Sequence, residues 1–413
     1  MRILSGRAAV SSVERLAARG TPSTVLEAKV KRIVDDVRRG GDKAVRSYAE
    51  RWDGLGKKQS FRVPLPELER AWKSISPELQ RSLRQAAANI RRFCRWQKPT
   101  NFTRNGNGIS LGQLVRPLDA VGCYIPGGRY PLMSTVLMTV IPAQVAGVKR
   151  IAVVSPKPST EVLAAAALLG VNEFYRIGGA QAIAALAYGT KTIARVDKIV
   201  GPGNAYVTAA KKLVSFDCAI DFLAGPTEAL IVSHSGRADF IAADLVCQAE
   251  HDADAVAIFI TTSSQLARAV ENCVNRLVAE NATARESLTR NGAILIASSK
   301  TQAREWANAI ACEHLTISPQ DVPFITNAGS IFVGNYSPQA AGDYASGPNH
   351  VLPTAGQARF RGGLSVLDFV KVMTVQNLSA EGLQRIARSV ECLAKAEGLQ
   401  AHAHSIRVRC RHA

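Results

Sequence analysis

The feature that most constrains this chain is an alternation of short apolar runs with helix-compatible segments, which begins near Leu118. Apolar runs with the length of strands occupy residues 151–154, 174–177, 199–200, 230–232, 256–260, 294–296 and 331–333. The segments between them, such as 161–169, 180–188 and 204–214, are rich in alanine, the residue with the highest helix propensity. Alternation on this scale predicts parallel sheets with helices on both faces, which is an α/β fold.

Two Gly/Pro turns divide the alternating region. Ile125-Pro126-Gly127-Gly128 and Ala224-Gly225-Pro226 bracket a block of about a hundred residues, which is the size of one lobe inserted into another. Amphipathic helical patterns dominate the chain before about residue 110 and after Leu364. The expected division is an N-terminal arm (1–22), a larger α/β lobe (23–123 with 228–364), an inserted lobe (124–227) and a small helical C-terminal piece (365–413).

Composition and charge exclude several classes of protein. The 413 residues are 47% hydrophobic, which excludes a largely disordered chain. The net charge of +18 comes from scattered basic residues rather than from one motif, so we expect no nucleic-acid partner. No apolar stretch of about 20 residues exists, and the first residues do not resemble a signal peptide. The eight cysteines form no C-x-x-C pair, which favours free thiols in the cytoplasm.

Histidines that lie near other polar residues in the sequence form the first candidate site. Gln248 and His251 are three residues apart, so on a helix they share one face and can converge. Asp343 lies in a loop rich in turn-forming residues, and His402 lies near the C-terminus. Together they offer the mixed nitrogen and oxygen donors that zinc accepts. Taken singly, a Gln/His pair is more often a surface or capping feature, and spacing alone does not show that the four side chains meet.

Adjacent acid and imidazole groups form a second candidate. Glu313 and His314 supply two potential proton carriers, although neighbouring residues in a chain point in different directions.

Three glycine turns form a third candidate. The turns are 125–128, 178–181 and 201–204, and the last of them follows an apolar run and opens a helix-like segment. Such turns expose backbone amides to an anion such as a pyrophosphate. No G-x-G-x-x-G motif is present, and each turn alone is better explained as an ordinary tight turn. Three in one block favour a dinucleotide site.

In combination these segments resemble the histidinol dehydrogenase family, zinc- and NAD-dependent enzymes that complete histidine biosynthesis. The resemblance extends from about Val25 to Arg409, which is nearly the whole chain. It is carried by the segments 116–128, 178–182, 201–205, 224–228, 248–252, 313–315, 342–353 and 397–402.

The resemblance implies roles for individual residues. The implied metal ligands are Gln248, His251, Asp343 and His402, the last of them supplied by the partner subunit of an intertwined homodimer. The implied acid/base pair is Glu313 and His314, and the implied NAD contacts are Tyr124, Gln181 and Asn204. The implied substrate contacts are Thr227, Gln248, His251, His314, Asp343, His350, Glu397 and His402. The lobes would be incomplete Rossmann-like units, the inserted one binding NAD, and the C-terminal piece would mediate dimerisation.

The implied reaction is a four-electron oxidation of L-histidinol to L-histidine through L-histidinaldehyde, with reduction of two NAD. Two departures from the family pattern are notable: Thr227 stands where many members carry serine, and the stretch 313–330 is several residues shorter than usual. Two alternatives stay open. One is a paralogous dehydrogenase for another primary alcohol, such as a sulfonated diol. The other is a zinc hydrolase that binds no nicotinamide, for which the glycine turns would have no purpose.

Overall fold

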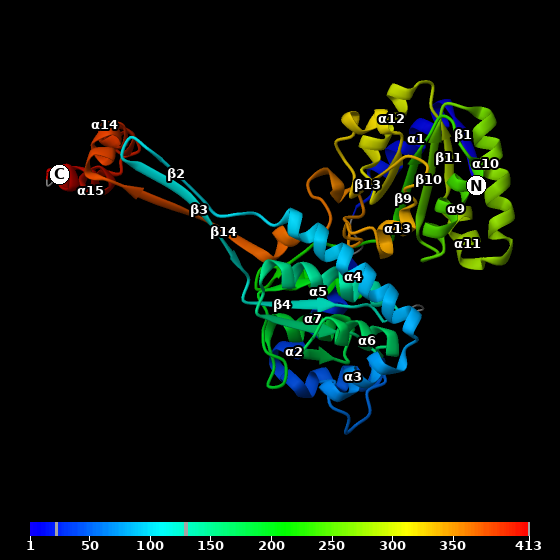
Figure 1. Ribbon diagram of the computed structural model, residues 1–413, viewed down its shortest axis with the longest axis horizontal. Coiled ribbons are helices and arrows are strands. Elements are labelled where there is room, and N and C mark those ends of the chain that lie inside the picture. Colours follow the sequence, from blue (N-terminus) through cyan, green and yellow to red (C-terminus); the bar gives the residue numbers. More distant parts are fainter. Residues whose placement is uncertain (21–23, 128–130, 412–413) are drawn as a thin grey trace.

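The α/β class predicted from the sequence is confirmed by the structure, a computed structural model that describes residues 1–20, 24–127 and 131–411. Figure 1 shows two groups of helices packed around sheets, and a long arm that extends away from both. Two of the three sheets are parallel and the third, in the arm, is antiparallel. No helix within the described ranges has both the length and the apolar character needed to cross a membrane. All eight cysteines lie in these ranges and are free thiols.

The larger parallel sheet, here called sheet A, has six strands. Their spatial order is β1 (Arg2–Ser5), β11 (Ala293–Ile296), β10 (Val256–Thr261), β9 (Glu228–Val232), β12 (His314–Ile317) and β13 (Ser330–Val333). Its covering helices are α1 (Gly6–Ala17) and α12 (Lys300–Ile310) on one face and α9 (Ala238–Ala249), α10 (Ser264–Leu277) and α11 (Ala282–Arg290) on the other. Leu230 and Val232 pack into the first layer, Ala229 and Ile231 into the second. Because both faces of β9 are buried, the strand is apolar after its first residue, Glu228.

The second parallel sheet, sheet B, has five strands in a related order. They are β6 (Glu173–Tyr175), β5 (Arg150–Val154), β4 (Ala120–Tyr124), β7 (Lys198–Val200) and β8 (Ala219–Ile220). The helices α3 (Leu65–Ser74), α4 (Pro77–Gln97), α5 (Met133–Ala146) and α6 (Thr160–Leu168) share one core, and α2 (Thr24–Tyr48), α7 (Gly179–Tyr188) and α8 (Ala205–Val214) share the other. The chain order reverses between β4 and β7 in sheet B, as it does between β9 and β12 in sheet A.

The packing differs from the expected division in the first part of the chain. In the N-terminal piece, residues 2–17 belong to the larger parallel sheet and its cover, because β1 pairs with β11 and α1 packs on α12. The helices between residues 24 and 97 pack on sheet B, where α2 contacts α7 and α8, rather than on the sheet that follows residue 228. An amphipathic pattern shows that one face of a helix is buried, but it does not identify the surface that buries it.

The arm combines residues from two distant parts of the chain (Figure 1). Strand β3 (Ile109–Pro117) pairs antiparallel with β2 (Phe102–Gly106) on one side and with β14 (Val370–Leu378) on the other. The helices α14 (Ala380–Ala396) and α15 (Gln400–Arg411) lie at its far end. The C-terminal piece was expected to be helical, so β14 is a correction to that expectation. Short connecting helices are η1 (Ala49–Asp53), η2 (Val278–Glu280), η3 (Pro319–Phe324), α13 (Gln339–Tyr344), η4 (Gln357–Arg359) and η5 (Val366–Phe369).

Candidate active site

A buried carboxylate lies at the amino edge of sheet A. Strands β9 and β12 are parallel neighbours with His314 in register with Ala229. Glu313, just before β12, therefore lies beside Glu228, the first residue of β9. The Thr227 hydroxyl donates a hydrogen bond of 2.7 Å to Oε2 of Glu313, and the backbone N–H of Glu228 donates one of 2.9 Å to the same oxygen. Glu313 is buried. Its carboxylate is therefore held in one orientation by two donors from the neighbouring strand.

The imidazole of His314 lies between two carboxylates. Its Nε2 is 3.2 Å from Oδ1 of Asp343, its Nδ1 is 3.6 Å from Oε2 of Glu313, and its ring stacks on Phe332. Burial lowers the pKa of His314, but the negative charge of Glu313 and the hydrogen bond to Asp343 outweigh burial and raise it to about 10. In this arrangement the ring holds a proton that both carboxylates stabilise.

The short helix α13 places Asp343 against His314. Gln339, one turn earlier on α13, donates a 3.0 Å hydrogen bond from Nε2 to the Thr316 hydroxyl. Gln339 and Asp343 are one turn apart on α13, and they contact Thr316 and His314, which are two residues apart on β12. These two contacts set the register between the helix and the strand. The Nε2 of Gln248 donates a 2.9 Å hydrogen bond to Oδ2 of Asp343. Burial raises the pKa of Asp343, but its hydrogen bond and charge interaction with His314 outweigh burial and lower it.

His350 connects this cluster to the helices of sheet B. Its Nδ1 lies 2.7 Å from the backbone carbonyl oxygen of Asp343, and its Nε2 lies 3.3 Å from the hydroxyl of Thr135 on α5. A carbonyl oxygen only accepts hydrogen bonds, so Nδ1 carries the proton and Nε2 accepts from the threonine. Burial lowers the pKa of His350, which favours this neutral form.

The structure unites some of the predicted metal ligands and separates others. Gln248 and Asp343 touch, and His251 follows within one turn, exposed at the end of α9. Glu397 and His402 are exposed at the far end of the arm, away from the cluster (Figure 1). Across the residues that the structure describes, no three His, Cys, Asp or Glu side chains form a metal-binding group. The oxygen donors of Gln248 and Asp343 suit a divalent ion, but one chain alone does not complete the predicted ligand set.

A cavity of about 570 Å³ lies at the carboxyl edge of sheet B. Tyr124, Gln181 and Asn204, the three predicted NAD contacts, all line it. The other lining residues are Ile33, Trp52, Asp53, Gly127, Pro156, Lys157, Gly179, Ala180 and Tyr206. Tyr124 ends β4 and Asn204 follows β7, so the cavity lies where the strand order reverses. Dinucleotides bind at this place in doubly wound α/β sheets.

The walls of this cavity are fixed by hydrogen bonds. Asn204 caps α8, because its Oδ1 accepts from the backbone N–H groups of Tyr206 at 3.1 Å and Val207 at 3.2 Å. Gln181 donates from Nε2 to Oδ2 of Asp53 at 3.1 Å, while its Oε1 is buried without a hydrogen-bond partner among the described residues. A buried oxygen without a hydrogen-bond partner is unusual in proteins, and this one belongs to a residue that lines the cavity.

Asp53 is a component of this cavity that the sequence did not indicate. Its Oδ2 also accepts from the backbone N–H of Gly178 at 3.0 Å, so it joins η1 to the turn before α7. Burial raises the pKa of Asp53, although hydrogen bonds from Gly178 and Gln181 oppose that effect. The only signal in the sequence was an acidic residue just before the glycine that ends a helical segment.

Comparison with known proteins assigns the chain to a family. The family model for histidinol dehydrogenase matches residues 17–410. Histidinol dehydrogenase of Methanothermobacter thermautotrophicus is 48% identical over 394 residues, covering 92% of each chain, and that of Aquifex aeolicus is 45% identical over 392 residues, covering 93% of this chain and 92% of its own. The crystal structure of histidinol dehydrogenase from Elizabethkingia anophelis matches with a TM-score of 0.95 at 36% identity, over 100% of this chain and 98% of that chain. With such a match in sequence and in structure, this chain belongs to the histidinol dehydrogenase family, which are oxidoreductases of histidine biosynthesis.

Proposed function

We propose that this chain oxidises L-histidinol to L-histidine through L-histidinaldehyde, with two NAD and a bound zinc ion. The observation that carries the proposal is the combination of two sites. One is the cluster that unites Thr227, Gln248, Glu313, His314 and Asp343. The other is the cavity lined by all three predicted NAD contacts. A zinc hydrolase would need only the first of these sites.

Two of the proposed metal ligands, Gln248 and Asp343, are already in contact. Gln248 and Asp343 supply oxygen donors, His251 is next along the chain, and His402 would come from a second copy. When bound, zinc would anchor the imidazole and amine of the substrate and so orient the alcohol carbon. Asp343 also fixes His314, so the same carboxylate links substrate position to the position of the proton acceptor.

The acid/base pair can serve both oxidation steps. In the first step His314 would take the hydroxyl proton of histidinol as the carbon loses two electrons and a hydrogen. This step requires the neutral ring, which a cation bound to Asp343 would favour by offsetting the carboxylate charge that raises the pKa of His314. In the second step Glu313 would take a proton from the water that adds to the aldehyde carbon. Thr227 and the backbone N–H of Glu228 keep the Glu313 carboxylate oriented for this task. In total, alcohol plus water plus two NAD⁺ gives carboxylate, two NADH and three protons, with NAD as the electron acceptor.

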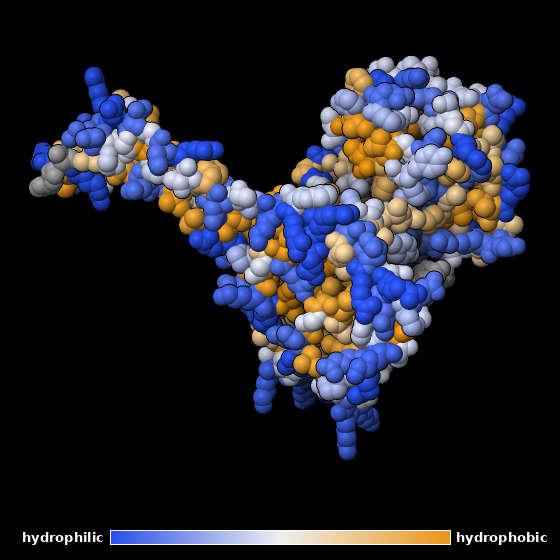
Figure 2. All heavy atoms as spheres, viewed as in Figure 1, coloured by the Kyte–Doolittle hydropathy of each residue, from blue (hydrophilic) through white to orange (hydrophobic). Residues whose placement is uncertain are grey.

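We infer that the active form is a cytoplasmic homodimer in which the arm of one chain completes the site of the other. The arm exposes apolar side chains on its strands, including Leu111, Val372, Met373 and Val375. Figure 2 shows the arm standing clear of the rest of the molecule. Apolar strand residues with no cover in the single chain are typical of an interface. His402 lies on α15 at the far end of this arm, whereas Gln248 lies on α9, which covers sheet A (Figure 1).

The test combines activity with metal content. Purified enzyme with L-histidinol should produce two NADH per histidine, followed by absorbance, and should contain about one zinc per chain by elemental analysis. NADH production with other primary alcohols but not with histidinol would identify a paralogue. No NADH with any alcohol would refute the dehydrogenase proposal. Mixing two inactive variants, His251→Ala and His402→Ala, should restore activity after subunit exchange, and failure to do so would refute shared sites.

A further inference from the structure

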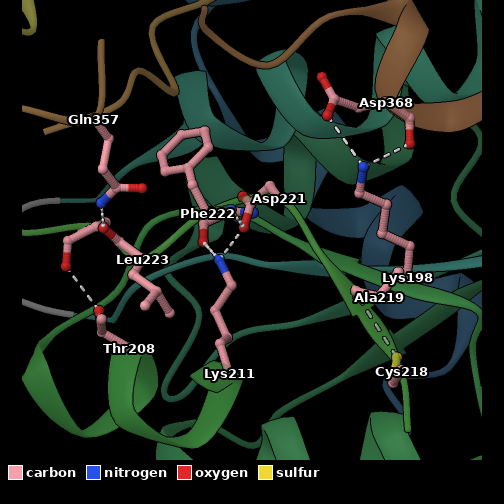
Figure 3. A network of polar contacts seen from close by, with 12 residues as sticks. Lys198, Thr208, Lys211, Cys218, Ala219, Asp221, Phe222, Leu223, Gln357 and Asp368 are labelled. Carbon is pink, nitrogen blue, oxygen red and sulfur yellow. Dashed lines mark hydrogen bonds and ion pairs between the residues drawn. The ribbon is translucent and has the colours of Figure 1, made fainter. Parts of the chain in front are cut away.

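A fully buried ion pair lies behind the cavity of sheet B, outside the groups assigned to catalysis. Lys211 on α8 is 2% exposed and Asp221, which follows β8, is 3% exposed, and their Nζ and Oδ1 atoms form an ion pair (Figure 3). Most ion pairs of the chain, by contrast, are partly open to solvent, as for Lys212 with Glu27. Removing two charges from water is costly, and a buried pair is weak evidence for a stabilising purpose. A positional purpose is the better explanation here.

The pair holds both backbone polar groups of one glycine. The N–H of Gly201 donates to Oδ2 of Asp221 at 2.7 Å, and its carbonyl oxygen accepts from Nζ of Lys211 at 2.9 Å. Gly201 has a φ of +113°, and a Cβ there would overlap the carbonyl oxygen of Tyr124. The turn that the ion pair fixes therefore lies directly against Tyr124 and leads into Asn204, two walls of the cavity.

The same pair anchors the connection from sheet B to sheet A. Residues 221–227 form this connection, and backbone groups of residues 221–225 are held from two sides. From α8, Thr208 donates to the carbonyl oxygen of Ala224 at 2.9 Å. From the segment before the arm, Gln357 donates to the carbonyl oxygen of Leu223 at 2.5 Å.

Two further contacts complete this connection. Arg361 donates to the backbone oxygen of Asp221 and lies 4.6 Å from the centre of the Phe222 ring. At the other end, the backbone N–H of Gly225 donates to the Thr354 hydroxyl at 2.6 Å. Two residues later comes Thr227, whose hydroxyl holds Glu313. One continuous set of contacts thus runs from the turn at Gly201 to the catalytic carboxylate.

We propose that Lys211 and Asp221 are positioning residues that set the placement of the dinucleotide relative to the Thr227–Glu313 pair. They act through Gly201 on one side and through residues 221–225 on the other. The inference rests on the proposed function and deepens it, because hydride transfer depends on the distance and angle between the nicotinamide and the alcohol carbon. A misplacement of about 1 Å can reduce a rate by about a hundredfold.

The test is Lys211→Met, with Lys212→Met as the matched control. Lys212 is the next residue on the same helix, is half exposed and pairs with Glu27 at the surface. For Lys211→Met we expect kcat to fall by about 10- to 100-fold and KM for NAD to rise by about tenfold. KM for L-histidinol and zinc content should stay within about twofold of wild type, because no metal or substrate group is altered. The control should match wild type in every measurement.

Several outcomes would overturn the inference. A folded Lys211→Met enzyme with unchanged kcat and unchanged KM for NAD would overturn it. A rise in KM for histidinol as large as the rise in KM for NAD would also overturn it. If that variant does not fold, Thr208→Val removes a single hydroxyl contact of the same connection and must show the same pattern, at about threefold size. Wild type inactive on histidinol would refute the proposed function alone. Direct binding of NADH, followed by its fluorescence, would then decide this inference: Lys211→Met must bind more weakly than Lys212→Met.

Discussion

Replacing Glu228 with glutamine is expected to make the stability of this chain less dependent on pH. Glu228 is 4% exposed at the start of β9. Arg19 Nη1 at 2.7 Å and the backbone N–H of Ala355 at 2.9 Å both contact its Oε1, while Oε2 has no hydrogen-bond partner within the described ranges. Glutamine keeps Oε1 and puts its amide nitrogen where Oε2 stands, so Glu228→Gln removes the charge and retains both contacts.

The magnitude follows from the pKa of this carboxyl group. Burial raises the pKa of Glu228 from 4.5 to about 7, with the Arg19 charge opposing and the Glu313 charge adding to the effect. A carboxyl group with a higher pKa in the folded state binds its proton more tightly there. The stability from that proton is present below about pH 4.5 and is lost as pH rises through about 7. A difference of about 2.5 pKa units corresponds to about 3 kcal/mol.

The assay is chemical unfolding of wild type and variant at about pH 5 and about pH 8. Wild type should lose about 2.5 kcal/mol more free energy of unfolding between these two pH values than Glu228→Gln does, because part of the full effect is already lost at pH 5. Glu286→Gln is the control, because Glu286 is an exposed carboxylate paired with Arg290, and it should follow wild type. Equal losses in wild type and Glu228→Gln would show that the pKa of Glu228 is not raised, and the reasoning from burial would fail.

Three further substitutions test the candidate site and the arm. His314→Asn should reduce turnover by about 10²- to 10⁴-fold with zinc content unchanged, and a normal rate would exclude His314 as the base. Asp53→Ala leaves the N–H of Gly178 without its acceptor, so KM for NAD should rise by about tenfold while KM for histidinol is constant. Met373→Asp on the exposed arm should shift sedimentation from dimer to monomer and abolish activity, because His402 of a second copy is then absent; a fully active monomer would contradict shared sites.

Most of the strands that the sequence predicted lie inside a sheet with both faces covered, although the predicted run 331–333 is the partly exposed edge strand β13. The runs 151–154 and 256–260 became β5 and β10 because a strand with two covered faces is continuously apolar. Strand β12 was missed because it opens with His314, directly after Glu313, and so reads as polar. Those two residues are polar because they are the candidate catalytic pair. The neighbouring strands still pair with His314, and Glu313 lies directly before the strand.

The candidate site depended on family resemblance more than on spacing. Gln248 and Asp343 are 95 positions apart, and nothing local in either segment specifies their contact. For the same reason the sequence did not indicate that Asp53 contacts Gln181, because the two residues are 128 positions apart and Asp53 lies on a helical segment expected to pack elsewhere. Contacts of this kind depend on which helix covers which sheet, and amphipathic patterns do not specify that choice.

The two candidate sites lie at opposite kinds of edge on the two parallel sheets. The candidate acid/base groups are at the amino edge of sheet A, whereas the proposed dinucleotide cavity is at the carboxyl edge of sheet B. The loops after β5 and β6 can therefore be rebuilt without altering any side chain near Asp343, whereas the turn after β7 is held by Lys211 and Asp221 and should be kept. Variants with a changed preference between NAD and NADP and variants with a changed preference between alcohols can therefore be sought in two separate libraries. Neither library should change residues 221–225.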